Sequence, residues 1–197
     1  PHNVERHLFP ASAVCELKAV LAEEWLRARR PDLEIETIVC DVRDPQSVAD
    51  LVAFTMDRFG QLNFAVNSAA YASTPAATHE ISFEDAGNTL STDVMGVFTC
   101  MKYQIQAMLR SGGGTIVNVS SVNGLSGVPS AALYSAGKHA VIGLTRSAAK
   151  EYIGRGIRIN AVCPGATETP RRTRRTAHLT PDQLLEHQQQ LAHAIPI

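Results

Sequence analysis

The sequence predicts an α/β domain built on a doubly wound parallel sheet. Three observations predict this fold: short apolar stretches typical of strands alternate with longer stretches of helical periodicity, the alternation is evenly spaced, and the strand candidates are apolar on both faces. Right-handed crossovers between parallel strands place the connecting helices on each side of such a sheet. Ligands of these folds bind beyond the carboxyl ends of the strands, where we therefore expect the chemistry.

The first two predicted elements lie within residues 12–40. Ser12 is a favourable N-cap residue, and apolar residues follow it at helical spacing until Pro31, which ends the predicted helix. Residues 34–40, EIETIVC, are short and rich in β-branched side chains, as strands are. We therefore expect a helix followed by a strand.

The next helix and strand lie between residues 44 and 66. Asp44 followed by Pro45 is typical of a helix start, because aspartate caps free N–H groups and proline fits the first helical position. Apolar residues follow one helical face as far as Gly60, a residue type that commonly ends helices. Residues 62–66, LNFAV, then predict a strand.

Two long helices dominate the rest of the sequence. Ser82 with Asp85 resembles a capping box at the start of the first, and three glycines at 112–114 follow its end. The predicted elements, in order, are a helix over 82–110, a strand over 115–119, a polar loop over 120–129, a helix over about 130–152, a strand over 157–162 and a helix from Thr180. Both long helices are apolar on more than one face, which predicts a homodimer or homotetramer.

Composition argues against several classes of protein. The 197 residues include 18 Lys and Arg against 19 Asp and Glu, so no general basic surface is available for nucleic acid. No apolar run approaches the ~20 residues of a membrane span, and no targeting signal is recognised. The four cysteines lack paired spacing and the seven histidines lack metal-ligand spacing. We expect a cytoplasmic protein with reduced thiols and no metal site.

Candidate acid–base residues follow the strand predicted over 115–119. That strand leads into Ser121, and Tyr134 and Lys138 come later, four residues apart on a predicted helix. Side chains at i and i+4 share one helical face, and a nearby ammonium lowers the pKa of a phenol. Ser121 could then bind a substrate carbonyl oxygen while Tyr134 gives or takes its proton. The alternative is a surface Tyr and Lys that are four residues apart by chance.

The sequence around these residues resembles the short-chain dehydrogenase/reductase family. The resemblance is carried by GTIVNVSSVNGLSGVPSAALYSAGK, HAVIGLTRSAAKEY, GIRINAVCPG, CDVRDPQSV and FGQLNFAVNSAA, and covers about residues 15–170. It implies a single Rossmann-like domain over 1–197 and an NAD- or NADP-dependent oxidoreductase. The expected reaction interconverts a secondary alcohol and a ketone in a small-molecule substrate.

The resemblance also assigns roles to individual residues. Tyr134 resembles the family's proton donor or acceptor, Lys138 the residue that lowers its pKa and holds the nicotinamide ribose, and Ser121 the substrate-orienting serine. Further cofactor-binding positions are implied at Asp41, Val42, Asn67, Ala69, Pro164, Gly165, Thr167 and Thr169. Residues 166–195 would be the substrate lid, whose mobility would set selectivity.

Three departures from the family pattern matter. Asp93 stands where the family often carries an asparagine that completes a proton relay through water. Asp93 could take part in such a relay, because a carboxylate can organise a water molecule, or it could have a purely structural role. Ala70 replaces a family glycine beside the cofactor. The phosphate-binding T-G-x-x-x-G-x-G loop of the family is not found, since no glycine precedes Gly60, and the family's last strand is not found either. We therefore expect a fold that is incomplete at both ends.

Two explanations remain open. Either segments of a complete enzyme are missing from this sequence, or the chain is a truncated relative that cannot hold a dinucleotide in the usual way. The functional alternatives to a dehydrogenase are therefore a cofactor-free binding or scaffold protein, and a non-redox lyase or isomerase that uses the same Ser–Tyr pair.

Overall fold

The computed structural model describes residues 18–71, 73–167 and 176–194. The chain divides into two compact units, one of residues 40–165 and one formed by the stretches on either side, 1–39 and 166–197. All strands of the described residues belong to the first unit. A single domain over 1–197 stays a prediction.

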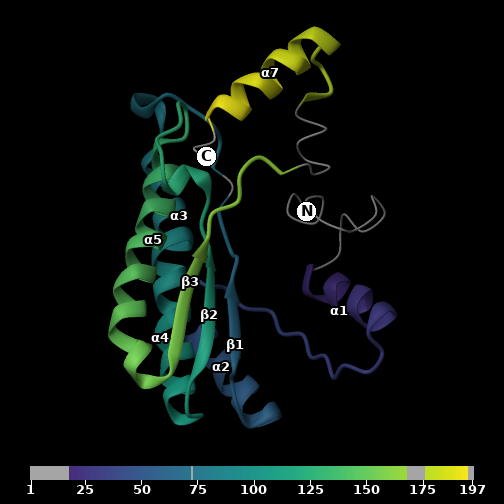
Figure 1. The fold of residues 1–197 in the computed structure, drawn as a ribbon, viewed down its shortest axis with the longest axis vertical. Coiled ribbons are helices and arrows are strands. Elements are labelled where there is room, and N and C mark those ends of the chain that lie inside the picture. Colours follow the sequence, from purple (N-terminus) through teal and green to yellow (C-terminus); the bar gives the residue numbers. More distant parts are fainter. Residues whose placement is uncertain (1–17, 72, 168–175, 195–197) are drawn as a thin grey trace. The chain divides into compact units, whose positions relative to one another are not determined.

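The 40–165 unit contains a parallel three-stranded sheet (Figure 1). Its strands are β1 (Phe64–Asn67), β2 (Gly114–Val119) and β3 (Ile157–Val162), in the order β1-β2-β3. Asn67 pairs with Asn118 in register, and Ile116 pairs with Ile159. Three of the four predicted strands, and the predicted α/β class with a parallel sheet, are thus confirmed.

The helices follow the predicted order. They are α1 (Lys18–Arg29), α2 (Pro45–Phe59), α3 (Phe83–Thr89), the π-helix η4 (Leu90–Gly96), α4 (Val97–Arg110), α5 (Ala132–Tyr152) and α7 (Pro181–Ala194), with short 3-10 helices η3 (Thr78–Glu80), η5 (Val122–Gly124) and η6 (Ile153–Arg155). The Asp44 carboxylate accepts a hydrogen bond from the N–H of Gln46 at 2.9 Å, as its capping role predicts. Gly60 ends α2 at a φ of 75°, in the left-handed region that favours glycine.

The helix predicted over 82–110 is one helical stretch with a change of hydrogen-bonding pattern in its middle. Ser82 caps it by accepting a hydrogen bond from the N–H of Asp85 at 3.0 Å. The chain then passes from α3 through η4 into α4 without leaving helical conformation. Such π-helical segments are rare and occur frequently at functional sites.

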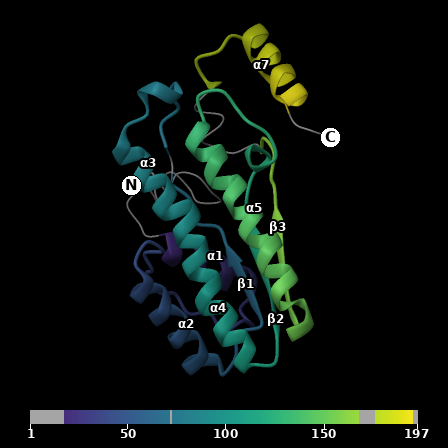
Figure 2. The ribbon, with the colours of Figure 1, turned by 90° about the vertical axis from the view of Figure 1, so that its left-hand side faces the viewer.

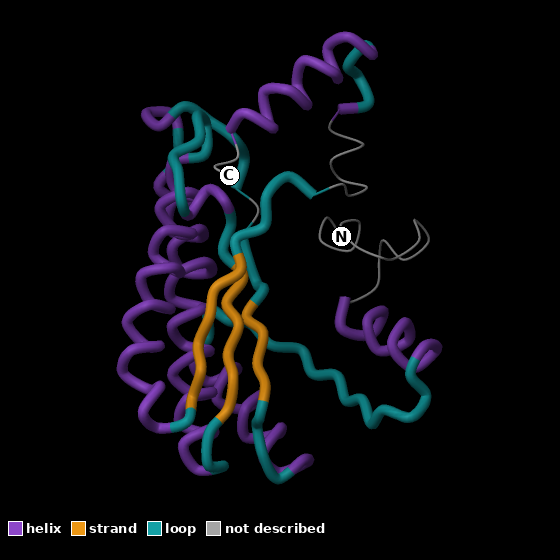
Figure 3. Tube along the Cα trace, in the orientation of Figure 1, coloured by secondary structure: helices purple, strands orange, loops and turns teal. Residues whose placement is uncertain are grey.

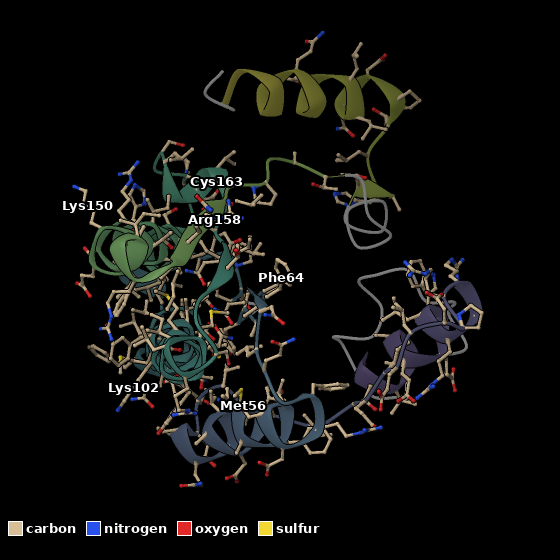
Figure 4. The ribbon with its side chains drawn as sticks, turned by 60° about the horizontal axis from the view of Figure 1, so that its bottom comes forward. Met56, Phe64, Lys102, Lys150, Arg158 and Cys163 are labelled. Atoms are coloured by element: carbon tan, nitrogen blue, oxygen red, sulfur yellow. The ribbon has the colours of Figure 1, made fainter. Side chains whose placement is uncertain are left out.

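The hydrophobic core lies between the sheet and the pair α4 and α5, which cover one of its faces (Figure 2). Inward-facing Ile116, Ile157 and Ile159 are at most 4% exposed and pack with Met108 of α4 and Val141 of α5. Strand side chains alternate between faces, and the opposite face carries exposed residues such as Phe64, which points away from these helices (Figure 4). Within the 40–165 unit, α4 and α5 therefore pack on one face, whereas the sequence predicted helices on each side.

The prediction of a strand over residues 34–40 is wrong. These residues form an irregular segment, drawn as loop in Figure 3, and Val39 is 70% exposed. A β-branched stretch becomes a strand only where a neighbouring strand receives its backbone hydrogen bonds. No strand of the described residues pairs with it.

Contacts within the other unit hold α1 to the segment that follows it. Glu23 accepts hydrogen bonds from Arg27 at 2.8 Å and from the Thr37 hydroxyl at 2.6 Å. Arg27 also donates to the carbonyl of Ile35 at 2.6 Å. Among the helices in the described ranges, none has both the length and the apolar character needed to cross a membrane.

Candidate active site

The candidate site lies at the carboxyl end of the sheet. Because the strands are parallel, β1, β2 and β3 all deliver their carboxyl ends to this one edge. The N-terminal turns of α5, which carry Tyr134 and Lys138, reach the same edge, since the Lys138 ammonium donates to the last carbonyl of β2. The arrangement matches the place where α/β sheets bind ligands.

Tyr134 and Lys138 do share one face of α5. The Lys138 Nζ atom lies 5.6 Å from the centre of the Tyr134 ring. Lys138 is 3% exposed, and its Nζ donates a hydrogen bond to the Val119 carbonyl at 3.1 Å. Burial lowers the pKa of the Lys138 ammonium, while the negative charge of Asp93 acts in the opposite direction. The local spacing thus correctly predicted the ammonium–phenol pair.

Two serines connect the end of β2 with α5. The Ser120 hydroxyl donates to the Lys138 carbonyl at 2.9 Å, which holds the strand end against the helix. Ser121 is 9% exposed, and its hydroxyl caps η5 by accepting a hydrogen bond from the N–H of Asn123 at 3.2 Å. Ser121 therefore sits next to the residue that bonds the backbone of Lys138, at the strand end to which the Lys138 ammonium points.

Gly124 makes this close packing possible. A Cβ atom at position 124 would lie 2.6 Å from the Ser120 Oγ and 2.7 Å from the Lys138 carbonyl oxygen. Neither neighbour can move without changing the site, so any side chain at position 124 would push η5 away from α5. The sequence analysis did not identify Gly124 as a site residue. The one feature of the sequence that could have indicated it is its position three residues after Ser121.

Asp93 lies fully buried in the π-helix η4. Its Oδ1 accepts a hydrogen bond from the N–H of Tyr71 at 2.7 Å, and its Oδ2 has no hydrogen-bond partner. Burial raises the pKa of this carboxyl, while the Tyr71 hydrogen bond and the charge of Lys138 act to lower it. The sequence analysis did not identify Tyr71, because the hydrogen bond comes from its backbone N–H, which any residue type except proline can supply.

Asn67 belongs to a buried network of polar side chains. Its amide group donates to Asn118 at 2.8 Å and exchanges hydrogen bonds with Gln104 at 2.8 and 3.0 Å. Asn118 in turn donates to the Thr145 hydroxyl at 2.9 Å. The Asn67 side chain thus joins β1 to β2 and α4 at the carboxyl edge.

Asp41 and Val42 lie just before α2. Asp41 forms an ion pair with Arg43 at 2.7 Å, and the hydrogen bonds from Arg43 lower the pKa of this half-exposed carboxyl to about 2. Val42 packs against η4, since a Cβ at Gly96 would lie 2.8 Å from the Val42 Cγ2. The segment is thus fixed beside the same π-helix that carries Asp93.

The remaining predicted cofactor positions lie after β1 and β3. Ala69 is exposed beyond β1. The Pro164 carbonyl accepts a hydrogen bond from the N–H of Val122 at 3.1 Å, which ties the segment after β3 to the segment after β2. Gly165 and Thr167 are exposed, with Thr167 in the other unit, and Thr169 lies outside the described residues.

This geometry suits transfer of a proton between a phenol and an oxygen atom of a ligand. A buried ammonium beside the phenol favours the phenolate, and the hydroxyl of Ser121 supplies a hydrogen-bonding group at the neighbouring strand end. No cluster of three or more potential metal ligands occurs among the described residues.

Comparison with known proteins finds a matching family and several similar proteins. Residues 11–180 match the short chain dehydrogenase family. The chain is 46% identical over 132 residues to a 2,5-dichloro-2,5-cyclohexadiene-1,4-diol dehydrogenase of Sphingobium indicum, covering 66% of this chain and 53% of that protein. It is 42% identical over 171 residues to an A-factor type gamma-butyrolactone 1'-reductase (1S-forming) of Streptomyces virginiae, covering 84% and 66%. The chain therefore spans about half to two thirds of the length of these relatives.

Solved structures share the fold. Levodione reductase superposes with a TM-score of 0.77 at 34% identity, over 83% of this chain and 63% of that one. NAD+-bound xylitol dehydrogenase superposes with a TM-score of 0.72 at 32% identity, over 75% of this chain and 56% of that one. ElxO with NADP bound superposes with a TM-score of 0.71 at 34% identity, over 79% of this chain and 66% of that one.

Proposed function

Because this chain belongs to the short chain dehydrogenase family, we propose that it is an NAD(P)-dependent oxidoreductase that interconverts a secondary alcohol and a ketone. The observation that carries the proposal is the buried Lys138 ammonium 5.6 Å from the ring of Tyr134, beside the end of β2. The two relatives named above are a dehydrogenase and a reductase, and two of the similar solved structures, xylitol dehydrogenase and ElxO, hold NAD+ and NADP respectively.

Each of the three residues has a role in the reduction direction. The Ser121 hydroxyl donates a hydrogen bond to the carbonyl oxygen, and Tyr134 delivers the proton to that same oxygen. Lys138 favours the phenolate that remains on Tyr134. A nicotinamide cofactor supplies the hydride when bound. In the oxidation direction Tyr134 takes the proton from the alcohol.

The residues at the carboxyl edge fit the nicotinamide half of such a cofactor. An ammonium has three donors, and Lys138 donates one hydrogen bond to a described residue, at Val119, which leaves donors for ribose hydroxyls. Ala69 and Gly165 are small and exposed beside this edge. Pro164, Thr167 and Thr169 are assigned to the nicotinamide amide and phosphates by family position, and Asp41 and Val42 to the adenine.

Cofactor binding is the first test. Purified protein is titrated with NADH and, separately, NADPH while the fluorescence of the reduced nicotinamide is followed. We expect saturable binding of at least one cofactor, which also identifies the preferred one. A folded sample that binds neither would refute the dehydrogenase and support a cofactor-free binding protein.

Catalysis by Tyr134 is the second test. Removing the hydroxyl in Tyr134→Phe should lower kcat by about 10²–10⁴-fold, the usual contribution of general acid–base catalysis, with little change in the free energy of unfolding. Tyr103→Phe, a phenol on α4 outside the site, is the matched control and should keep the rate. An unchanged kcat in Tyr134→Phe would contradict the assigned role.

We extend the proposal to two further features. Residues 166–195, which include α7, would close over the substrate and set selectivity. A second copy of the chain would pack on the outer faces of α4 and α5, where a groove of about 280 Å³ runs between the two helices. The larger apolar residues that line it are Phe98, Met101, Ile105, Leu109, Leu144 and Tyr152. Lys102 and Glu151 at the groove would pair across a two-fold interface.

A further inference from the structure

We propose that Asp93 is the buried counter-charge of Lys138, and that it holds Tyr134 less acidic than the lysine alone would make it. The inference rests on the proposed function of Tyr134, and it assigns Asp93 to tuning rather than to direct proton transfer. Three structural observations support the inference. They are the position of the Asp93 carboxyl against α5, the small number of hydrogen bonds that this carboxyl accepts, and the positive charge that acts on it.

The carboxyl of Asp93 packs directly against α5. A Cβ at Gly137 would lie 3.3 Å from the Asp93 Cβ and 3.9 Å from its Oδ2, so the absence of a side chain at Gly137 admits Asp93 to the surface of the helix. Gly137 immediately precedes Lys138. The packing thus places the carboxyl against α5 one residue before Lys138, although 45 sequence positions separate Asp93 from Lys138.

Hydrogen bonds only partly stabilise an ionised Asp93. The N–H of Tyr71 serves Oδ1, while Oδ2 is buried without a partner. A buried carboxylate oxygen in this state is costly unless an opposite charge compensates it. Lys138 donates to the Val119 carbonyl rather than to Asp93, so the two charges act on each other through space.

The other ionisable groups nearby do not replace this interaction. On the side of α3, the Asp85 carboxylate accepts the hydrogen bond of the Tyr71 hydroxyl at 2.9 Å, which raises the pKa of that phenol. On the side of α5 the groups are Lys138 and Tyr134. The positive charge of Lys138 acts to lower the pKa of the Asp93 carboxyl.

The sign of the effect on Tyr134 follows from these charges. The ammonium favours the phenolate, whereas a carboxylate near the same ammonium disfavours it. Replacing Asp93 by a neutral side chain of the same shape removes the negative charge that favours the protonated forms of both Lys138 and Tyr134. Asp93→Asn keeps an Oδ1 acceptor for the N–H of Tyr71, so the packing against Gly137 is preserved.

The test is a pH titration of tyrosinate absorbance, which needs neither cofactor nor activity. Subtracting the curve of Tyr134→Phe from that of the parent isolates the ionisation of Tyr134, and the pair of curves is repeated with Asp93→Asn in both proteins. We expect the midpoint to move to lower pH by about one unit, the size of a single charge in a partly buried site. The midpoint of the pH–rate profile should move with it.

Controls separate this inference from the proposed function. Asp57→Asn removes an exposed carboxylate of α2 and should leave the midpoint unchanged. If Asp93→Asn does not fold, Asp93→Ser tests the same loss of charge. A midpoint that stays in place or rises would overturn the role of Asp93, even if Tyr134→Phe is inactive. A fully active Tyr134→Phe would instead overturn the proposed function, whatever the titration shows.

Discussion

At the scale of single residues, the site depends on two buried ionisable groups that each resist ionisation. Lys138 and Asp93 are 3% and 0% exposed, and burial is the largest influence on the pKa of both. Each charge partly compensates the other. Proteins tolerate such groups mainly where function requires them, because burying ionisable side chains lowers stability.

The raised pKa of Asp93 predicts how stability depends on pH. A carboxyl whose pKa is higher in the folded state than its unfolded value of 3.8 favours the folded protein at low pH and loses that contribution as pH rises. We therefore expect the native protein to lose free energy of unfolding relative to Asp93→Asn as pH rises above about 4. Urea unfolding of both proteins between pH 4 and pH 8 measures this difference in the free energy of unfolding. A difference between the two proteins that is constant with pH would contradict the burial effect.

At the scale of elements, polar side chains join the strands to the helices within the core. Asn118 of β2 is fully buried and bridges Asn67 of β1 to Thr145 of α5, and also contacts the sulfur of Met101 of α4 at 3.2 Å. A network whose members all have partners fixes the relative positions of the elements more narrowly than apolar packing does. It lies near the carboxyl edge, so it sets the positions of the strand ends that form the site.

Loss of one member should therefore cost stability. Asn118→Leu removes one hydrogen bond from each of Asn67 and Thr145 inside the core, and we expect a loss of about 1–3 kcal/mol in the free energy of unfolding. Asn160→Leu, the same change at an exposed position on β3, should cost much less. Combining Asn67→Leu with Asn118→Leu should cost less than the sum of the single changes, because both partners are then apolar. Additive costs, measured in urea, would count against a coupled network.

At the scale of the whole molecule, two apolar surfaces of the 40–165 unit differ in character. The α4–α5 groove combines apolar residues with one cation and one anion, Lys102 and Glu151. The sheet face opposite these helices carries Phe64 and Val66, which are 77% and 67% exposed. Of the two, the groove has the charge pattern that two copies related by a two-fold axis can satisfy mutually.

Assembly through the groove predicts a specific effect of charge. Phe98 is 44% exposed and lines the groove, so Phe98→Glu should convert a dimer or tetramer to a smaller species. Phe83→Glu is the control, because Phe83 is 97% exposed and lies on α3 outside the groove. Light scattering after gel filtration gives the mass of each. A native protein with the mass of one chain, or an unaffected Phe98→Glu, would contradict the interface.

Local spacing in the sequence by itself determined the helices α2 and α5, the strands β2 and β3, and the pairing of Tyr134 with Lys138. Caps, periodicity and i,i+4 neighbours depend on residues within a few positions, so they can be derived without a partner element. The strand expected over 34–40 failed because a strand depends on a neighbour that the pattern does not contain.

Only the tertiary structure decided how distant residues meet. It placed Asp93 against Gly137, Gly124 against the Lys138 carbonyl, and the amide of Asn67 inside a network with Asn118. These contacts join positions 14 to 51 residues apart through packing of separate elements, which sequence periodicity does not encode. The acid–base pair is thus local chemistry, whereas the burial and charge that tune it are properties of the folded chain.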